Sequence, residues 1–445
     1  MKETRVFPEE SGVNGWFETN RYKNRTFADL SQLQKDYDYV IVGAGFAGVN
    51  AAFRLAELRP DAAIALLDCF PVGYFSSGRN AGFIVEVPHA SGLVTNSKAS
   101  LDDYRWRYNF NRSVIARMKK IIDDHALQLD WVKSGAYKSS AIPESFSYID
   151  KGAKFFDALE IPYSILERDE LKERLGTDFY LRSIYTPNTV LVNPSEVVRG
   201  LATILPQNVT VFENTAVKEV KEGAVPSVIL KNGTALKAGK VILTVSGFLK
   251  HFGVKKADRV FAIHSFGGFT RELDSAEIDS LGSQIRPYGT TSAHPAGATV
   301  RLTSTRRILV RTVIRFATYD NISEERLNAA KKGVRRAFER RFPSLAHVPF
   351  EYFYGGYIPF TMNSQPFFGQ VGENVFAGAV GEGAGVTRAS TVGLYLADLI
   401  EGVDSEELRY VQKTFVPSYI APEPFRTIGA NARILWDNIH AKIEV

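Results

Sequence analysis

The stretch from Tyr37 to Asp68 decides the fold and reads YDYVIVGAGFAGVNAAFRLAELRPDAAIALLD. Residues 39–42 form a short aromatic and β-branched run, which is typical of a buried strand. Glycines in a G-x-G-x-x-G frame come next, followed by the apolar spacing of an amphipathic helix. A second buried run, residues 63–67, ends at the acidic Asp68. This order of strand, glycines, helix, strand and carboxylate predicts a dinucleotide-binding unit.

Each glycine of the frame has its own physical role. Gly43 permits the tight turn out of the strand, Gly45 lets the backbone approach a pyrophosphate, and Gly48 lets the helix pack closely on the sheet. The helix N-terminus offers N–H groups and the positive end of its dipole to the phosphates. Asp68 stands where a carboxylate can accept both hydroxyls of an adenosine ribose. The motif fits FAD or NAD, and its place near the N-terminus of a long chain favours FAD.

The composition indicates a globular protein with more than one small core. The chain has 445 residues, of which 45% are hydrophobic and 23% are charged, so we expect one large or two interleaved domains. Its 54 basic and 49 acidic residues include no dense basic run, which argues against nucleic-acid binding. The sequence has neither a membrane-length apolar window nor a charged-then-apolar leader. We therefore expect a cytoplasmic protein without a membrane span.

The cysteine and histidine pattern predicts no metal site. Cys69 is the one cysteine of the sequence, so a disulfide or a thiolate cluster cannot form within the chain. The seven histidines have no recognisable ligand spacing.

Strand and helix patterns predict a nucleotide domain assembled from distant segments. Residues 1–36 suggest a strap laid over the surface, and a helix is expected from Leu101 to about Val132. A second glycine cluster, residues 381–385, precedes a helix near the C-terminus. The predicted fold class is mixed α/β: a Rossmann-like FAD-binding domain with an interleaved antiparallel-sheet substrate domain. The predicted FAD-binding domain comprises residues 1–95, 191–255 and 351–445, and the substrate domain comprises residues 96–190 and 256–350.

Besides the first motif, several segments carry distinctive sequences. They are the loop Ser77-Gly78-Arg79-Asn80-Ala81-Gly82, the strand and turn Val241–Gly247, the cluster Gly383–Val386 and the tail Pro424–Trp436. Together they resemble the D-amino-acid oxidase family of FAD-dependent oxidoreductases. Within this family the chain is most similar to the γ-glutamylputrescine oxidoreductase branch. The resemblance implies an FAD domain of the glutathione-reductase/D-amino-acid-oxidase type.

The resemblance also implies a set of contacts with FAD. The S-G-R-N-x-G loop would lie near the isoalloxazine ring, Val217 near the adenine, and the late glycine cluster near the pyrimidine edge of the flavin. A helix that begins at this cluster would stabilise the anionic reduced flavin through its dipole. We expect FAD to be non-covalent, because Cys69 follows Asp68 and so lies near the adenosine. The implied cofactor residues are Gly43, Gly45, Gly48, Asp68, Ser77, Arg79, Asn80, Gly82, Val217, Gly247, Gly383, Gly385 and Val386.

The implied reaction is oxidation of a C–N bond in a small amine or amino acid. A hydride would pass to flavin N5, the imine would hydrolyse, and O2 or another acceptor would take the electrons. Arg79 is a catalytic candidate because its cation could stabilise the reduced flavin, and Asn80 is a candidate as a hydrogen-bond partner in the same loop. His264 is a further candidate. The alternatives are a surface arginine at position 79 and a core histidine at position 264.

Aromatic residues and one arginine are the substrate-binding candidates. Tyr74, Phe75 and Tyr357 offer aromatic faces that can hold a cation. Arg311 lies on an apolar strand, where it could bind a carboxylate. The alternatives are core packing for the aromatic residues and a solvated strand face for Arg311.

The chain departs from the family pattern at positions expected to face the flavin or the substrate. Tyr74 and Phe75 stand where relatives carry small residues, Tyr354 where they often carry Trp, and Ala384 where they usually carry His. An oxidase is the leading hypothesis. A dehydrogenase of the same fold that passes electrons to a quinone or carrier, and a flavin-binding protein without turnover, are the alternatives. An NAD-dependent dehydrogenase is a minor alternative.

Overall fold

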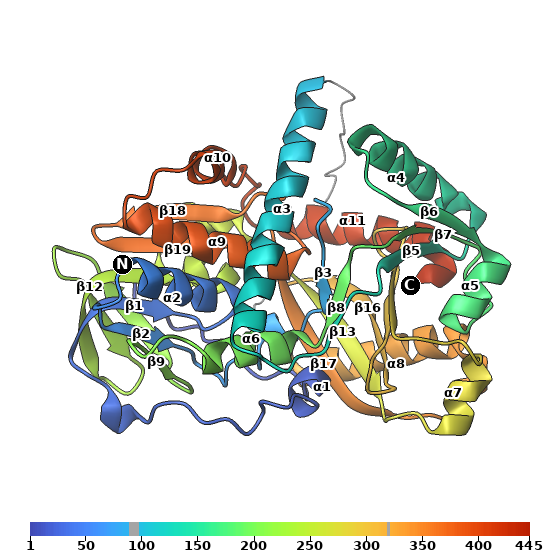
Figure 1. Cartoon of the computed structure of the whole chain (residues 1–445), viewed down its shortest axis with the longest axis horizontal. Coiled ribbons are helices and arrows are strands. Elements are labelled where there is room, and N and C mark those ends of the chain that lie inside the picture. The colour runs from blue at the N-terminus through green and yellow to red at the C-terminus, as the bar shows by residue number, and fades with distance from the viewer. Residues whose placement is uncertain (89–97, 318–320) are drawn as a thin grey trace.

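Two large β-sheets lie at opposite ends of the longest axis of the molecule (Figure 1). They are seen in a computed structural model that describes residues 1–88, 98–317 and 321–445. One sheet is mixed with a parallel centre, and the other is almost wholly antiparallel. This pair of sheets confirms the predicted fold class. The domain boundary predicted at residue 95 lies outside the described residues.

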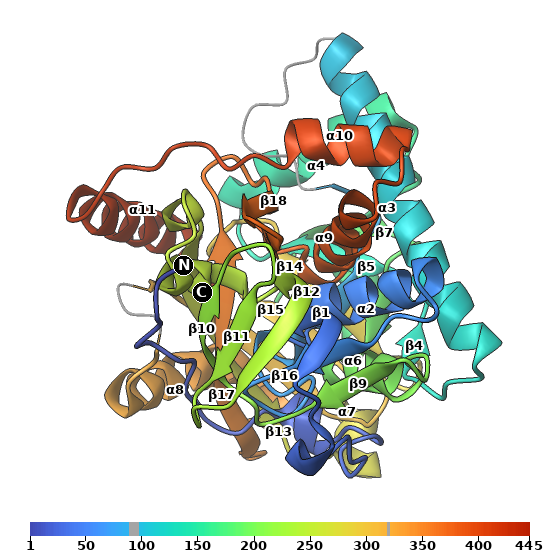
Figure 2. The ribbon, with the colours of Figure 1, turned by 90° about the vertical axis from the view of Figure 1, so that its left-hand side faces the viewer.

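The first sheet is built around β1 (Asp36–Val42), the strand that leads into the glycine motif. β1 is parallel to β2 on one side and to β12 on the other, and β2 is parallel to β9. The sheet order is β10–β11–β12–β1–β2–β9, with β19 also paired to β12 and β18 to β19 (Figure 2). The bounds of these strands are β2 Ile64–Leu67, β9 Val209–Phe212, β10 Val217–Lys221, β11 Ser227–Leu230, β12 Ala235–Leu243, β18 Phe367–Gly372 and β19 Val375–Ala379.

Two helices that follow glycine clusters pack against each other on one face of this sheet. They are α2 (Phe46–Leu58) and α9 (Gly385–Ile400), whose apolar residues enter a common core with those of α3 (Lys98–Asp124) and α6 (Pro194–Thr203). α3 is shorter at its C-terminal end than the predicted helix, because Ala126 has a left-handed φ of 50° that ends the helix. Trp131–Val132 is instead strand β4.

The second sheet has the order β17–β13–β16–β15–β14–β5–β7–β6. All of its pairs are antiparallel except β14 with β5. Its edge strand β17 covers residues that the prediction assigned to the FAD-binding domain from position 351, so we propose that the boundary follows residue 360. The bounds are β5 Ala136–Ser140, β6 Ser164–Glu167, β7 Arg182–Thr186, β13 Phe261–Thr270, β14 Tyr288–Ser292, β15 Thr299–Leu302, β16 Ile308–Phe316 and β17 Phe350–Phe360.

The two faces of the second sheet have different coverings. On one face, apolar residues of α5, α7 and α8 form a core with the strands. On the other face lie α4, whose Ile149 packs on Ile184, and α11, which packs on β16. This second face also meets the loop that contains the S-G-R-N-x-G sequence. The helix bounds are α4 Phe146–Leu159, α5 Arg168–Leu175, α7 Ser275–Leu281, α8 Glu324–Arg341, α10 Glu406–Thr414 and α11 Phe425–Ala441, and a small third sheet joins β3 (Phe83–Ile84), β8 (Val190–Val192) and β4.

Residues 1–20, here called the N-terminal strap, connect the two sheets. The Thr4 backbone N–H donates to Lys218 O of β10, and Gly12 forms a β-bridge with Tyr354 of β17. The strap includes the short helix α1 (Gly15–Glu18), in which Trp16 is 2% exposed. Most of residues 1–36 are exposed or half-buried, as the prediction of a surface strap requires. Trp16 departs from it, because its ring inserts between the S-G-R-N-x-G loop and the second sheet.

Candidate functional site

The turn between β1 and α2 has the backbone geometry that a diphosphate requires. Gly43 has a φ of 104°, and a Cβ there would lie 2.6 Å from Thr244 O. A Cβ on Gly45 would lie 2.4 Å from Ser77 Oγ, and one on Gly48 would lie 1.8 Å from Gly43 O. None of the three positions can carry a side chain without local movement. Gly45, the N-cap residue of α2, has no side chain to cap the helix, and the Phe46 N–H makes only a long hydrogen bond of 3.4 Å to Ser77 Oγ. This end of the helix can therefore donate N–H groups to an anion.

Asp68 stands beside this turn at the end of β2. Its Oδ2 accepts a hydrogen bond from the Ala44 N–H at 2.7 Å, and its Oδ1 accepts one from the Phe70 N–H at 2.9 Å. Burial raises the pKa of this carboxyl to about 6. Each carboxylate oxygen has a second lone pair, so Asp68 can also accept the ribose hydroxyls that the sequence predicted for it.

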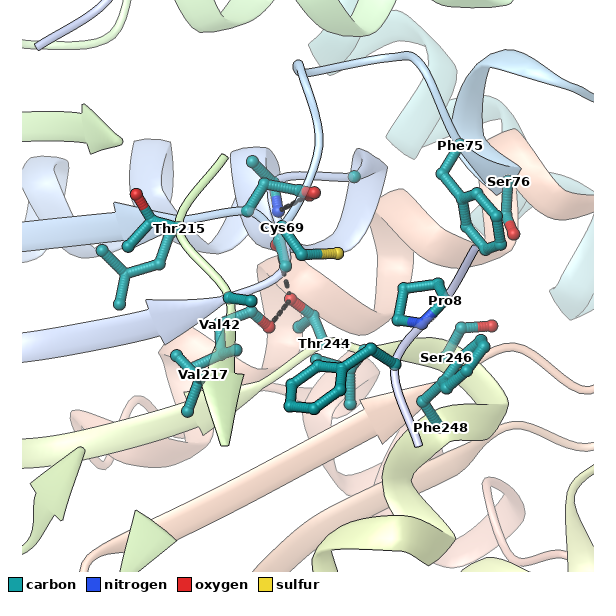
Figure 3. A pocket seen from close by; sticks show the side chains of 18 of the residues that line it. Pro8, Val42, Cys69, Phe75, Ser76, Thr215, Val217, Thr244, Ser246 and Phe248 are labelled. Carbon is teal, nitrogen blue, oxygen red and sulfur yellow. Dashed lines mark hydrogen bonds between the residues drawn. The ribbon is translucent and has the colours of Figure 1, made fainter. Parts of the chain in front are cut away.

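A cavity of about 860 Å³, including its open mouth, extends from this turn. Figure 3 shows Val217 and Thr215 towards one end, and Pro8, Phe75 and Phe248 towards the other. Of the predicted cofactor residues, the lining includes Gly43, Gly45, Asp68, Ser77 and Val217.

The N-terminal strap forms part of the cavity wall. Thr4, Val6, Phe7 and Pro8 all line it. Sequence reasoning missed these four residues, because they belong to an irregular segment about 30 residues before the motif and have no periodicity of their own. Their position follows from the pairing of the strap with β10.

Arg79 joins the S-G-R-N-x-G loop to the strap and to the second sheet. Its Nη1 donates to Ser11 Oγ at 2.7 Å and to Gly355 O at 3.0 Å. Its Nη2 donates to Gly12 O, and its Nε donates to Tyr74 O. The side chain is 3% exposed, and burial lowers its pKa. Arg79 thus positions three segments, and its catalytic role stays a prediction.

Asn80 shapes the same loop from within. Its Nδ2 donates to Ser77 O at 2.7 Å, and its Oδ1 accepts from the Gly82 N–H at 2.8 Å. Its backbone carbonyl accepts from Trp16 Nε1. Gly82 has a φ of 72°, and a Cβ there would lie 2.2 Å from Val192 O. Asn80 therefore fixes the turn that Gly82 completes, and its catalytic role also stays a prediction.

Arg301 holds the loop from the opposite side and was missed in the sequence. Its Nη1 donates to Ala81 O at 2.8 Å and to Gly82 O at 2.9 Å. The guanidinium lies 5.5 Å from the Trp16 ring centroid and 5.4 Å from that of Phe83. Burial lowers its pKa to about 10. Position 301 has no motif around it, so only strand pairing could reveal this contact.

The second glycine cluster leads into α9 as predicted. Ala384 precedes this helix and makes no side-chain cap bond, and a Cβ on Gly385 would meet no atom within 4 Å. A buried ion pair, Arg388 Nε to Glu382 Oε1 at 2.6 Å, holds the turn around Gly383. Val386 is buried in the core. The open N-terminus of α9 suits an anionic group such as a reduced flavin ring, although these residues are not part of the cavity lining described above.

Gly247, Tyr357 and His264 lie where the two sheets approach each other. A Cβ on Gly247 would lie 2.2 Å from Tyr357 Oη. The Tyr357 ring lies 5.2 Å from that of Phe248 and 6.1 Å from that of His264. Both Tyr357 and His264 are buried.

The two aromatic residues before the S-G-R-N-x-G string point to different places. Tyr74 contacts the Phe17 ring of the strap at 5.2 Å. Phe75 lines the cavity and stacks on Phe70 at 5.4 Å. The structure therefore puts Phe75, but not Tyr74, at the cavity wall.

Arg311 and Tyr354 lie on the face of the second sheet that meets the S-G-R-N-x-G loop. Both pair directly with Gly267 of β13, which places them in one row across the sheet. Arg311 Nη2 donates to Thr299 Oγ1 at 3.3 Å. Tyr354 Oη is buried beside the Trp16 side chain, and no described residue accepts a hydrogen bond from its O–H. A buried hydroxyl without a partner costs about 1–3 kcal/mol, so this row suits a ligand oxygen.

The described part of the chain contains no group of three His, Cys, Asp or Glu side chains arranged to hold a metal ion. None of the helices in the described ranges is both long and apolar enough to cross a membrane. The open glycine turn, Asp68 and the elongated cavity together fit an adenine dinucleotide such as FAD.

Comparison with known proteins supports this reading. The family model described as FAD dependent oxidoreductase (DAO) matches residues 38–399, and the chain belongs to this family. The probable oxidoreductase OrdL of Haemophilus influenzae is 25% identical over an alignment of 430 residues, and the alignment covers 93% of this chain and 93% of that protein. Glycine oxidase from Geobacillus kaustophilus has a similar fold, with a TM-score of 0.70, 17% identity and coverage of 87% of this chain and 100% of that one. L-proline dehydrogenase from P. horikoshii gives a TM-score of 0.66, 17% identity, and coverage of 86% and 100%.

Proposed function

We propose that this member of the FAD-dependent oxidoreductase family holds FAD non-covalently and oxidises the C–N bond of an amino acid or a related amine. The observation that carries the proposal is the row of Arg311 and Tyr354, which faces the S-G-R-N-x-G loop. A guanidinium beside a hydroxyl whose O–H has no acceptor is a suitable receptor for a carboxylate. An amino acid bound there by its carboxylate presents its α-carbon towards the loop.

The cofactor would be held mainly at its nucleotide end. Asp68 would accept the ribose hydroxyls, and the turn from Gly43 to Gly48 would donate N–H groups to the diphosphate. When bound, FAD supplies the acceptor for the hydride. Cys69 lines the cavity directly beside Asp68, at the adenosine end, so its thiol is remote from the expected place of the ring. This position supports non-covalent binding.

The chain's residues orient the substrate, and no strong base is needed. The amine would react in its neutral form, losing a hydride and a proton to become an imine, which water hydrolyses to a carbonyl compound and an amine. Arg311 would fix the carboxylate and Tyr354 would donate its O–H to it. Trp16 and Phe269, in edge contact at 4.7 Å, close the wall behind this row. These apolar rings would limit access of water during the transfer.

An oxidase is proposed in preference to a dehydrogenase. The fold is shared by an oxidase and a dehydrogenase, so the acceptor has to be measured. Under air, an oxidase forms hydrogen peroxide in proportion to the substrate consumed. A dehydrogenase forms little and reduces an artificial quinone instead.

The proposal is tested by anaerobic mixing of the purified yellow protein with amino acids, N-alkyl amino acids and polyamine derivatives. We expect the flavin absorbance to bleach with carboxylate-bearing amines. The variant R311M should raise the KM for these substrates at least tenfold without loss of bound FAD. Bleaching by polyamines alone, or no bleaching by any amine, would contradict the proposal.

A further inference from the structure

Four polar side chains lie in register across the second sheet. Arg311 of β16 pairs with Thr299 of β15, Thr299 pairs with Thr291 of β14, and Thr291 pairs with Lys138 of β5. Residues directly opposite each other in paired strands project from the same face. Arg311, Thr299, Thr291 and Lys138 therefore form one continuous row, here called the polar row, which starts beside Tyr354.

The side chains of the polar row project from the face of the sheet that meets the S-G-R-N-x-G loop. Tyr137, the neighbour of Lys138 in β5, belongs to the core on the opposite face together with residues of α5, α7 and α8. Since side chains alternate along a strand, Lys138 projects towards the loop side. The hydrogen bond between Arg311 and Thr299 shows the same orientation at the other end of the row.

Neighbouring rows on this face are covered, whereas three of the four residues in the polar row are at least partly exposed. Arg301, two residues beyond Thr299, is buried under Ala81 and Gly82 of the loop. Ser140, two residues beyond Lys138, donates to Glu444 near the C-terminus and is also buried. Between these rows, Thr299 is buried, Arg311 and Thr291 are half-buried and Lys138 is exposed. The row thus runs from the buried Tyr354 to the exposed Lys138.

Both cations of the polar row lack an anionic partner. Among the described residues, no carboxylate lies within ion-pair distance of Arg311 or Lys138. Burial lowers the pKa of the half-buried Arg311. An unpaired cation in such surroundings is stabilised by an anion supplied from outside.

We propose that the polar row binds a substrate with two anionic groups, so that an acidic side arm contacts Lys138 while the α-carboxylate contacts Arg311. This inference rests on the proposed function and specifies its substrate class as acidic amino acids or N-substituted amino acids with a second carboxylate. The backbones of Arg311 and Lys138 are three strand spacings, or about 14 Å, apart. The long side chains can lean towards each other, and the hydroxyls of Thr299 and Thr291 can donate to the intervening arm.

Binding of carboxylates that cannot be oxidised provides a test independent of turnover. The FAD-loaded protein is titrated with glutarate and with butyrate by calorimetry, with the flavin spectrum as a second readout. We expect glutarate to bind at least tenfold more tightly than butyrate. The K138M variant should lose this preference and keep its butyrate affinity within twofold. K133M, which removes an exposed lysine from the same segment, is the matched control and should behave as the unaltered protein does.

Reversal of the charge gives a complementary test on substrates. K138E should lower kcat/KM for glutamate relative to its uncharged analogue norvaline at least tenfold, and should improve turnover of ornithine. Equal binding of glutarate and butyrate, or equal effects of K138M and K133M, would overturn the inference. In that case bleaching by monocarboxylate amines would still leave the proposed function intact, whereas failure of every amine would remove both.

Discussion

Asp68 is the residue through which pH should act on cofactor binding. Its carboxyl lies at the end of a buried strand, and burial raises its pKa from 3.8 to about 6. Two backbone N–H groups, those of Ala44 and Phe70, donate to it and partly oppose this shift. The charged form is the better acceptor for ribose hydroxyls. Protonation of Asp68 near pH 6 should therefore lower the affinity of the protein for the nucleotide.

We predict that the dissociation constant of FAD rises as the pH falls from 8 to 5, and that D68N binds FAD weakly with little dependence on pH. Fluorescence titration of the cofactor-free protein measures both. The stability of that protein should change in the opposite sense. The folded pKa exceeds the unfolded one, so the stabilisation present below pH 3.8 is lost as the pH rises through about 6. Identical pH profiles for the two proteins would contradict this account.

Two helices from opposite ends of the chain, α2 and α9, pack against each other, and their backbones approach most closely at Gly393. A Cβ on Gly393 of α9 would lie 1.9 Å from Ala47 O of α2. The absence of a side chain there lets both helix N-termini approach the nucleotide site from one face of the sheet. The contact thus connects the first glycine motif with the second.

We predict that G393A lowers the free energy of unfolding by about 1–3 kcal/mol, because the added methyl group forces the helices apart. G429A is the matched control. Gly429 lies in the exposed helix α11, and a Cβ there would meet nothing within 4 Å. This change should stabilise the chain by up to about 1 kcal/mol, since Ala favours a helix over Gly. Urea unfolding of both variants measures the difference, and equal effects would show that the α2–α9 contact is not tight.

At the scale of the whole molecule, Arg79 connects three parts that are distant in sequence. Its guanidinium donates to the strap at Ser11 and Gly12, to β17 at Gly355, and to its own loop. The strap contacts both sheets, because its Thr4 N–H donates to Lys218 O of β10 and its Gly12 forms a β-bridge with Tyr354 of β17. Because strap residues also line the nucleotide cavity, this junction should couple the interface of the sheets to cofactor affinity.

We predict that R79M raises the FAD dissociation constant at least tenfold and speeds tryptic cleavage at Arg5 in the strap. Several buried carbonyl groups would lose their donor, each at a cost of about 1–3 kcal/mol. R79K should restore part of the affinity, and R286M, at an exposed arginine, should have no effect. Normal FAD affinity together with resistance to trypsin in R79M would refute the positioning role.

Much of the nucleotide-binding half could be predicted from the sequence. The turn from Gly43 to Gly48, Asp68 and the helix after the second glycine cluster are local patterns, because backbone conformation and periodicity over about 30 residues specify them. The same reasoning identified the antiparallel second sheet and singled out Arg311. It missed the burial of Trp16 within the strap and extended α3 too far.

The sequence by itself determined where the chain turns around a nucleotide, since glycine conformation, strand composition and helix amphipathicity are properties of neighbouring residues. Only the tertiary structure decided what surrounds that nucleotide. The strap in the cavity wall, Arg301 behind the loop and the alignment of Arg311 with Lys138 all depend on the pairing of distant segments. In a sheet, a shift of one residue moves every side chain to the other face. The composition of the proposed substrate site therefore follows from strand register, which short-range sequence patterns do not encode.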